Sequence, residues 1–364
     1  MIPISKPFIG NEEKKAVLEV MDSGLIAQGP KVAEAEEKLA DICGTRHAVL
    51  LNSGTAGLHT SLHVAGIGKD DEVITTPFTF IATANPILMQ GAKPVFADIE
   101  LDTFNIDPKS IEEKITKKTK AIITVDLYGH LCDYVKIKRI ADEHGLIVIE
   151  DACQAIGAEY NKKMAGSFGH MGIFSFYATK NITCGEGGAI VTNDMNYAKK
   201  AKLFRQHGMS ALGDYDYNDV GYNYRTTDIN AAILLEQLKK LDKITKKRIE
   251  NAKFLSGNLE NISVIQIPVV KKWHKHVFHQ YTIKANKFKL SRDKLVEYLK
   301  KKGIGCSIYY PKPLHLCESF MKLGYKKGDF PVAEEASETV LSLPVHPSLK
   351  QKELKFIVDS IKNI

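Results

Sequence analysis

The segment SFYATKNITCGEGG places Lys180 directly after apolar and aromatic residues that are typical of a buried strand. Burying an ammonium group is costly unless the group is paired or used chemically. Such a lysine can be a surface charge at a strand end, or a nucleophile held in a pocket. Gly185, Gly187 and Gly188 follow it and would let the backbone pass close to a bound group. The choice between these two interpretations depends on which other polar residues could act together with Lys180.

Two other segments carry groups that could act together with this lysine. In LNSGTA, Gly54 and Thr55 open a predicted helix, whose free N–H groups and positive end favour a phosphate. In IEDACQ, Asp151 ends an apolar run, where a carboxylate needs a cation or a hydrogen-bond donor. Taken singly, the first is equally an ordinary helix N-cap and the second a structural cap of a turn.

Taken together, the three groups are the parts that pyridoxal phosphate (PLP) requires. A helix terminus holds the phosphate, a lysine holds the aldehyde as a Schiff base, and an aspartate keeps the ring nitrogen protonated. Ser175 lies on the predicted strand that leads to Lys180 and can reach the phosphate. The combination predicts a PLP site in which Lys180 and Asp151 are catalytic residues.

The elements that must position these groups alternate along residues 45–194. Runs rich in Val, Ile and Phe predict strands buried on both faces, and amphipathic stretches between them predict helices. The alternation indicates an α/β fold with a mostly parallel sheet between two helical layers, which binds ligands at the carboxyl ends of its strands. The predicted strands are HAVLLN, DEVITT, KPVFAD, KAIITVD, LIVIED and IFSFY, and the predicted helices cover 56–64, 80–90, 108–116 and 135–144.

Helical patterns also precede and follow this alternation. One helix is capped by Asn11 and stops at Gly24, and a second begins after Gly29-Pro30. A single long helix over 227–259 is predicted from its apolar stripe.

The long helix leads into a smaller predicted α+β domain. Its predicted strands are 263–267, 279–284 and 306–310, and its predicted helices are 291–302 and 351–361. We therefore predict a large domain over 1–240 and a small domain over 241–364.

Composition narrows the class of protein. The chain has 364 residues, of which 44% are hydrophobic and 26% charged, as in soluble globular proteins. It has no apolar run long enough to cross a bilayer and no signal-peptide pattern, and its six cysteines lack metal-ligand spacing. We predict a cytoplasmic protein without a metal site, a membrane span or a nucleic-acid partner. The net charge of +7, concentrated in C-terminal lysines, could attract an anionic substrate.

At this point the motifs resemble those of a known family, the DegT/DnrJ/StrS nucleotide-sugar aminotransferases. The resemblance covers nearly the whole chain and implies the fold of aspartate aminotransferase, PLP fold type I, with a sheet of the seven-stranded type. It is carried by KPFIGNEEKKAVLEVMDSGLIAQGPKV, LNSGTAGLH, TPFTFIATANPILMQGAKPVFADI, IEDACQAIGAEY, FSFYATKNITCGEGGAIVTND, VGYNYRTTDINAAI and GIGCSIYYPKPLHL.

The resemblance also implies roles for individual residues. Lys180 corresponds to the lysine that holds the cofactor and moves the proton, and Asp151 to the partner of the pyridinium nitrogen. A homodimer with shared active sites is implied, because one phosphate contact comes from a second subunit. The remaining implied cofactor contacts are Gly54, Thr55 and Ser175 at the phosphate, Phe80 on the ring, Gln154 at the 3′-oxygen and Asn223 from the second subunit; the implied substrate contacts are Arg225, Tyr309, Tyr310 and His315.

Some of these residues have an ordinary alternative. Judged without the resemblance, Phe80 is a core residue, and Asn223 and Arg225 form a surface turn and a salt bridge. The chain also departs from the family pattern at two positions. His170 stands where relatives often have Asp, and Tyr309 stands where many have His, which changes the expected substrate contact there.

The activity implied is transfer of an amino group from an amino acid, L-glutamate in the family, to a keto group on a nucleotide-linked sugar. Such reactions serve amino-sugar and surface-polysaccharide synthesis. Lys180 distinguishes this chain from dehydrating relatives, which carry His at that position. The alternatives are another PLP enzyme of the same fold, such as an amino-acid aminotransferase or a desulfurase, and a non-catalytic regulatory relative.

Cues to the sugar conflict. NITCGEGGA resembles family members that aminate C4, whereas EDACQAIG and YYPKPLHL resemble members that act at C3. Between them we favour a UDP-linked N-acetylhexosamine derivative, with the position of amination left open.

Overall fold

The central element is a seven-stranded sheet in the order β1-β9-β8-β5-β4-β2-β3. The computed structural model describes residues 1–210, 215–286 and 290–364. β9 runs antiparallel to β1 and β8, and the other neighbouring pairs are parallel. The strands are β1 (His47–Leu51), β2 (Glu72–Thr75), β3 (Lys93–Phe96), β4 (Thr119–Val125), β5 (Ile147–Asp151), β8 (Met171–Ser175) and β9 (Gly188–Thr192).

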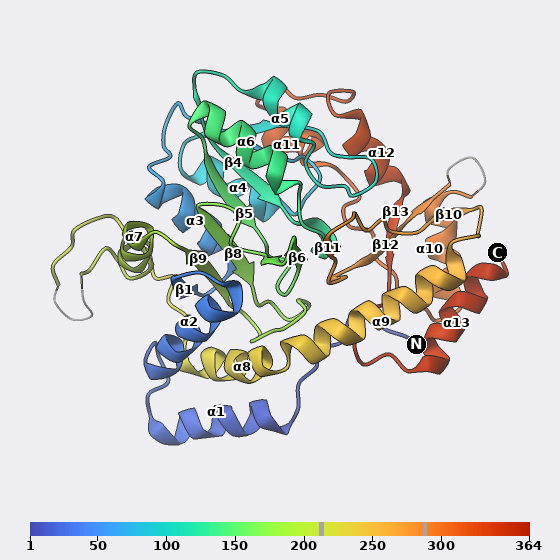
Figure 1. The fold of residues 1–364 in the computed structure, drawn as a ribbon, viewed down its shortest axis with the longest axis horizontal. Helices are drawn as coiled ribbons and strands as arrows, with labels where there is room; N and C mark the ends of the chain where they lie inside the picture. Colours follow the sequence, from blue (N-terminus) through green and yellow to red (C-terminus); the bar gives the residue numbers. More distant parts are fainter. Residues whose placement is uncertain (211–214, 287–289) are drawn as a thin grey trace.

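Helices cover both faces of this sheet (Figure 1). Alternate strand residues point to opposite faces, so that Ile149 packs with α3 (Gly54–Val64) and α7 (Met195–Arg205), whereas Val148 packs with the other layer. That other layer contains α2 (Pro30–Cys43), α6 (Tyr134–His144) and α8 (Asp228–Lys239), and α1 (Asn11–Ser23) lies outside it against α8. The predicted α/β fold with a mostly parallel sheet is confirmed.

All six predicted strands of the large sheet are present, but the prediction lacked β9. Its sequence, GAIVT, follows directly on the glycines after Lys180 and was not separated from that loop. The first residue of this strand, Gly188, must be a glycine, because a Cβ there would lie 2.2 Å from the carbonyl carbon of Ser53. The close approach brings β9 against the start of α3.

The predicted helix over 227–259 is wrong in one respect, because it breaks at Lys240 into α8 and α9 (Leu241–Leu259). There the amide of Lys240 donates to the carbonyl of Gln237, one residue tighter than in an α-helix. The Lys240 ammonium lies 2.6 Å from a carboxylate oxygen of Glu13 in α1. α8 thus stays with the large sheet, and α9 runs on toward the C-terminal elements (Figure 1).

Other helix boundaries also shift. The predicted helix over 80–90 divides into a 3₁₀ turn, η1 (Ile81–Thr83), and α4 (Asn85–Met89). Pro86, in the first turn of α4, has no N–H to continue an earlier helix. The remaining helix of the large sheet is α5 (Pro108–Lys114). The N-cap of α1 is Gly10, whose amide donates to the carboxylate of Glu13, and not Asn11.

The C-terminal part forms a second sheet in the order β10-β12-β13. The predicted strand over 306–310 is wrong, because only Ser307 makes a bridge, to Ser342. β13, which the prediction lacked, takes the place beside β12. The elements are β10 (Ile265–Gln266), β12 (Tyr281–Ala285), α10 (Arg292–Lys301), η3 (Leu314–Leu316), α11 (Glu318–Met321), α12 (Pro331–Thr339), β13 (Val340–Leu343) and α13 (Gln351–Lys362).

A third, small sheet, β11-β6-β7, joins the two parts of the chain, with β6 (Glu159–Tyr160), β7 (Lys163–Met164) and β11 (His274–Lys275). A further buried group combines Phe96 of β3 and Phe78, from the loop after β2, with Phe320 and Phe330. Because packing continues across residue 240, the division at 240/241 stays a prediction. No helix in the described ranges is long and apolar enough to cross a bilayer.

Candidate active site

A cavity of about 620 Å³ lies at the carboxyl ends of β5 and β8 and at the start of α3. Parallel α/β sheets bind ligands at this edge. Nine of the predicted site residues line it: Gly54, Thr55, Phe80, Asp151, Gln154, Ser175, Lys180, Tyr309 and Tyr310.

The start of α3 supplies the anion-binding end of the cavity. Ser53 caps the helix, its hydroxyl accepting from the amide of Ala56 at 3.1 Å. Gly54 lies so close to β8 that a Cβ there would be 2.8 Å from Cys153 Sγ and 3.1 Å from Ser175 Cβ. The first amides of a helix have no intrahelical partner, so those of Gly54 and Thr55 suit a phosphate.

Lys180 lies in the turn that follows β8. Its backbone amide donates to the carbonyl of Tyr177 at 2.9 Å, and its side chain is half-buried in the cavity wall. The ammonium makes no hydrogen bond or ion pair with any residue that the structure describes. An amine in this position is available to a bound group rather than committed to the fold.

Asp151 ends β5 and is only 6% exposed. Its Oδ2 accepts from the hydroxyl of Thr83 at 2.8 Å, and its Oδ1 from the amide of Cys153 at 3.3 Å. Thr83 is in turn 2.9 Å from the hydroxyl of Thr79. These contacts fix the carboxylate in a buried position where it can pair with a protonated ring nitrogen. Sequence reasoning missed Thr79 and Thr83, although both are polar residues within an apolar stretch.

Gln154, Tyr310 and Phe80 form another wall. Gln154 Oε1 accepts from the amide of Tyr128 at 2.9 Å, and its Nε2 donates to the hydroxyl of Tyr310 at 3.3 Å. Burial, and then the charge of Asp151, raise the pKa of Tyr310 above its usual value. Phe80 is 58% exposed, with its ring 6.3 Å from that of Tyr310, so it is not a core residue. An exposed aromatic in a cavity can stack on a planar ligand.

Three predicted contacts do not line the cavity. Asn223 is exposed. The backbone of its segment is held by Asn52, which precedes the cavity residue Ser53 and donates to the carbonyls of Asn223 at 3.4 Å and Tyr224 at 2.9 Å. Arg225 is partly buried beside it. His315 is fully buried and lies 3.0 Å from Glu334, so its position does not support direct contact with a substrate.

His170 and three C-terminal lysines all lie outside the cavity. His170 accepts from the amide of Val148 at 3.0 Å, and it does not line the cavity. Within the described ranges, three of the C-terminal lysines that could attract an anion are engaged in ion pairs away from the cavity. These pairs are Lys271–Asp102 at 2.6 Å, Lys275–Glu159 at 2.6 Å and Lys284–Glu335 at 2.8 Å.

Several cavity residues were not predicted. Tyr177 and Glu186 come from the loop around Lys180, and His279 and Gln280 come from the segment that leads into β12. The signal for the last two was a pair of polar residues inside the apolar run VFHQYTI. Nothing in the sequence indicates that this run, a hundred residues further on, lies beside Lys180.

The residues present fit PLP. The cavity offers a helix terminus for the phosphate, with Gly54 packed too closely for a side chain, and a buried carboxylate held by hydroxyl and amide donors. It also offers an ammonium without a partner among the described residues. These three groups lie around one cavity, whose volume of about 620 Å³ is large enough for PLP.

Comparison with known proteins agrees with this geometry. A sequence model of the DegT/DnrJ/EryC1/StrS aminotransferase family matches residues 7–362. The chain belongs to this family. It is therefore a transaminase, as the resemblance implied.

Relatives are similar over their full length. The pleiotropic regulatory protein of Geobacillus stearothermophilus is 44% identical, over 99% of this chain and 97% of that protein. The spore coat polysaccharide biosynthesis protein SpsC of Bacillus subtilis is 38% identical, over 100% of this chain and 97% of that protein.

Solved structures agree with the fold. PseC of Helicobacter pylori, an aminotransferase involved in the biosynthesis of pseudoaminic acid, is 34% identical with a TM-score of 0.93, over 100% of this chain and 98% of PseC. Spr1654 of Streptococcus pneumoniae, in its PLP form, is 30% identical with a TM-score of 0.95, over 100% of this chain and 98% of Spr1654.

Proposed function

We propose that this protein is a PLP-dependent aminotransferase that moves an amino group from L-glutamate to a keto group on a nucleotide-linked sugar. The observation that carries the proposal is the cavity shared by Lys180, Asp151 and the start of α3. Names of similar proteins support the sugar, since SpsC is a polysaccharide biosynthesis protein and PseC acts in pseudoaminic acid biosynthesis. The cofactor is supported by the PLP form of Spr1654.

When bound, PLP supplies an aldehyde that takes up the amine and a ring that withdraws electrons from the donor Cα. The amides of Gly54 and Thr55, with the hydroxyl of Ser175, would hold its phosphate, and Phe80 and Gln154 would orient its ring. Asp151 would keep the ring nitrogen protonated. Lys180 Nζ would take the proton from the donor Cα and deliver it again in the transfer.

The sugar would lie near the remaining polar wall. Tyr309 and Tyr310 come from the loop before η3, and Gln280 from the segment before β12. Tyr128 donates its hydroxyl to the carbonyl of Tyr309, which fixes that loop. Hydroxyl and amide groups of this kind suit the hydroxyl or amide groups of a sugar. We infer a UDP-linked N-acetylhexosamine derivative as the first substrate to test.

We also infer a homodimer in which Asn223 and Arg225 act in the active site of the second subunit. Both lie outside this chain's cavity, on a segment whose backbone is fastened to Asn52. The side chain of Asn223 is exposed, as a residue that reaches into another subunit must be in the isolated chain. Shared sites would make the dimer the active form. We place this enzyme in the cytoplasm, where nucleotide sugars are made.

The test is spectroscopic. Purified protein should be yellow, and borohydride should attach a pyridoxyl group to Lys180, found by peptide mass spectrometry. Lys180→Ala should lose both properties, with at least about a 1,000-fold loss of activity, because no other group can replace the amine. Lys162→Ala, on the surface turn between β6 and β7, is the matched control and should behave as wild type. Full activity in Lys180→Ala would refute the mechanism.

The substrate is tested in two halves. L-Glutamate should convert the bound cofactor to its amine form, and that form should then react with one of a panel of UDP- and dTDP-linked 3-keto and 4-keto sugars. Reaction with 2-oxo acids alone would favour an amino-acid aminotransferase, and sulfur release from cysteine a desulfurase. The name of the 44% identical relative favours a regulatory function as a second candidate. Absence of both half-reactions in a yellow protein would support it.

A further inference from the structure

Asn181, the residue directly after Lys180, is held by two contacts from one segment, residues 276–280. Its Nδ2 donates to the carbonyl of Val277 at 3.4 Å, and its Oδ1 lies 3.3 Å from Nδ1 of His279. Asn181 and His279 are both buried. Because His279 lines the cavity together with Lys180, the turn that carries Lys180 is fastened to a second segment of the same cavity wall.

These contacts also determine which nitrogen of His279 carries the proton. Since Asn181 Nδ2 is engaged with a carbonyl, Asn181 Oδ1 is the acceptor and His279 Nδ1 is the donor. His279 Nε2 is then an acceptor, and Gln280 Nε2 lies 3.4 Å from it as a donor. Burial, and next the positive charges of Lys180 and Arg248, lower the pKa of His279, so the ring is neutral.

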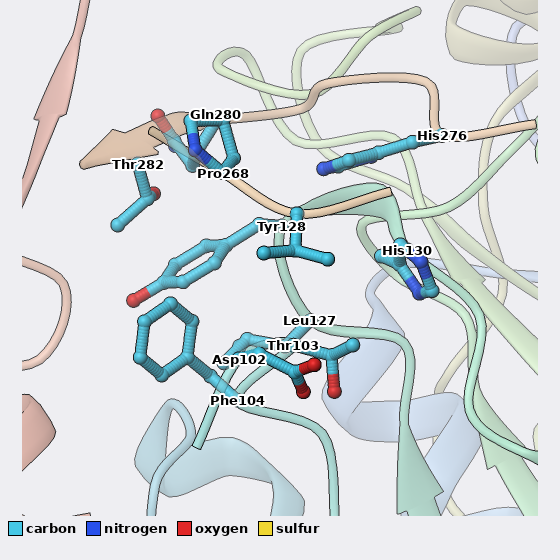
Figure 2. Close-up of a pocket in the computed structure, with 11 residues that line it drawn as sticks. Asp102, Thr103, Phe104, Leu127, Tyr128, His130, Pro268, His276, Gln280 and Thr282 are labelled. Carbon is cyan, nitrogen blue, oxygen red and sulfur yellow. The ribbon is translucent and has the colours of Figure 1, made fainter. Parts of the chain in front are cut away.

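The segment 276–280 is itself fixed to the chain around Tyr128 and Gly129. Val277 donates to the carbonyl of Gly129 at 3.1 Å, and Gln280 to the carbonyl of Tyr128 at 3.3 Å. Figure 2 shows Tyr128 and Gln280 among the residues that line one small pocket. Gly129, with φ +96°, permits the contact, because a Cβ there would lie 3.0 Å from the amide of His279.

The chain around Tyr128 also holds Gln154, which is a second predicted contact of the cofactor. The amide of Tyr128 donates to Gln154 Oε1 at 2.9 Å. Contacts therefore connect the turn of Lys180 to Gln154. They run from Asn181 to His279, along the chain to Gln280, and from there through Tyr128 to Gln154.

We propose that His279 is a positioning residue for amino transfer, which acts on Lys180 through Asn181. The inference rests on the proposed function, in which Lys180 Nζ moves the proton. A neutral imidazole can hold the turn without placing a second positive charge beside Lys180. Its removal leaves Asn181 Oδ1 unpaired in a buried position and frees the turn.

The first experiment measures the half-reaction with L-glutamate by stopped-flow absorbance. His279→Ala and Asn181→Ala should each lower the rate constant about 10-fold, with little change in the half-saturating glutamate concentration. The double variant should lose no more than Asn181→Ala alone, because that substitution already removes the contact with His279. His279→Asn should recover most of the rate, since its amide can still donate to Asn181.

The second experiment does not depend on turnover. Absorbance of the bound cofactor is titrated against pH in wild type, His279→Ala, His279→Asn and a control, His274→Asn. His274 lies in β11, just before the segment 276–280, is half-buried, and contacts Lys272 and Tyr160 instead of Asn181. We expect the midpoint to shift in His279→Ala alone, because only there does the amine of Lys180 lose its fixed position.

Additive losses in the double variant, or an unchanged midpoint in His279→Ala, would overturn the proposal. If His279→Ala does not fold, His279→Leu is compared with His279→Asn, and equal rates for these two would also overturn it. A wild-type protein that neither absorbs as a PLP enzyme nor reacts with glutamate would instead refute the proposed function, so the two failures can be told apart.

Discussion

At the scale of single residues, the site depends on positions where a side chain would not fit. Gly54 opens α3 against Cys153 and Ser175, and Gly188 brings β9 against Ser53. Glycine here is required by close approach of backbone rather than by an unusual φ. Small residues therefore shape the phosphate end as much as the polar groups do.

Gly54→Ala tests this point. Its Cβ would lie 2.8 Å from Cys153 Sγ, so we expect loss of about 1–3 kcal/mol of stability and about 10-fold weaker binding of PLP. Both are measured on the same samples, by thermal unfolding and by titration of cofactor absorbance. Gly257→Ala in α9, where a Cβ meets nothing within 4 Å, is the control and should be neutral or stabilising.

The double variant Gly54→Ala/Cys153→Ala separates crowding from other causes. Removing Sγ relieves the closest contact, and the remaining one to Ser175 Cβ is 3.1 Å. We expect partial recovery of both properties. Equal defects in the single and double variants would mean that the crowding argument is wrong.

At the scale of elements, buried carboxylates join helices that are far apart in sequence. Asp228 at the start of α8 accepts from the amides of Gly29, Lys31 and Val32, which closes the start of α2. Glu13 of α1 accepts from Lys240 at 2.6 Å, at the break between α8 and α9. Asp228 thus connects α2 to α8, and Glu13 connects α1 to the break between α8 and α9.

The ionisation of Glu13 makes the stability of the folded protein depend on pH. Although burial opposes its ionisation, hydrogen bonds from Lys240, the amide of Gly10 and Gln237 lower the pKa of Glu13 from 4.5 to about 2. Because the folded pKa is the lower one, the stabilisation is present above pH 4.5 and is lost as pH falls toward 2. Glu13→Gln should therefore cost about 1–2 kcal/mol at pH 7, and less as the pH falls below 4.5.

Urea unfolding of wild type and Glu13→Gln between pH 7 and pH 3 measures the difference in their free energies of unfolding, because the loss begins below pH 4.5. Glu12→Gln is a matched control, since Glu12 shares Lys240 at 3.1 Å but its side chain is 61% exposed. We expect almost no change for it, because exposed ion pairs contribute little. If the difference in free energy of unfolding between wild type and Glu13→Gln does not become smaller as the pH is lowered, the lowered pKa of Glu13 in the folded protein is contradicted.

At the scale of the whole molecule, the chain forms the cavity but holds Asn223 and Arg225 outside it. Exposed apolar and aromatic side chains occur near that segment, among them Tyr217, Val220 and Tyr222. A second copy of the chain would cover such residues. The proposed dimer thus explains both their exposure and the position of Asn223.

Mixed dimers test whether sites are shared. Lys180→Ala and Asn223→Ala chains are purified separately, unfolded together and refolded, or co-expressed with different tags. If sites are shared, each mixed dimer has one site with both residues intact, so a random mixture should recover about a quarter of wild-type activity. Activity no higher than the average of the two separate variants would show that each chain uses its own Asn223.

Much of the fold could be predicted because it depends on local patterns. Val- and Ile-rich runs and the helices between them specified a mostly parallel sheet, Gly24 marked the end of α1, and Gly29-Pro30 marked the start of α2. β9 and β13 were missed, because β9 follows directly on a glycine-rich loop and β13 follows directly on α12, so that neither short strand stands apart in the sequence pattern. The break at Lys240 depends on a partner in α1 more than two hundred residues away, which no local pattern reveals.

The sequence by itself determined the order of chemical groups at strand ends, Lys180, Asp151 and the Gly54–Thr55 helix start, because a parallel sheet brings such ends to one edge. Only the tertiary structure decided what surrounds them. Thr83 on Asp151, His279 on the turn of Lys180 and the exclusion of His315 all come from contacts between distant segments. Such contacts depend on how layers pack, which residue types and spacing do not specify.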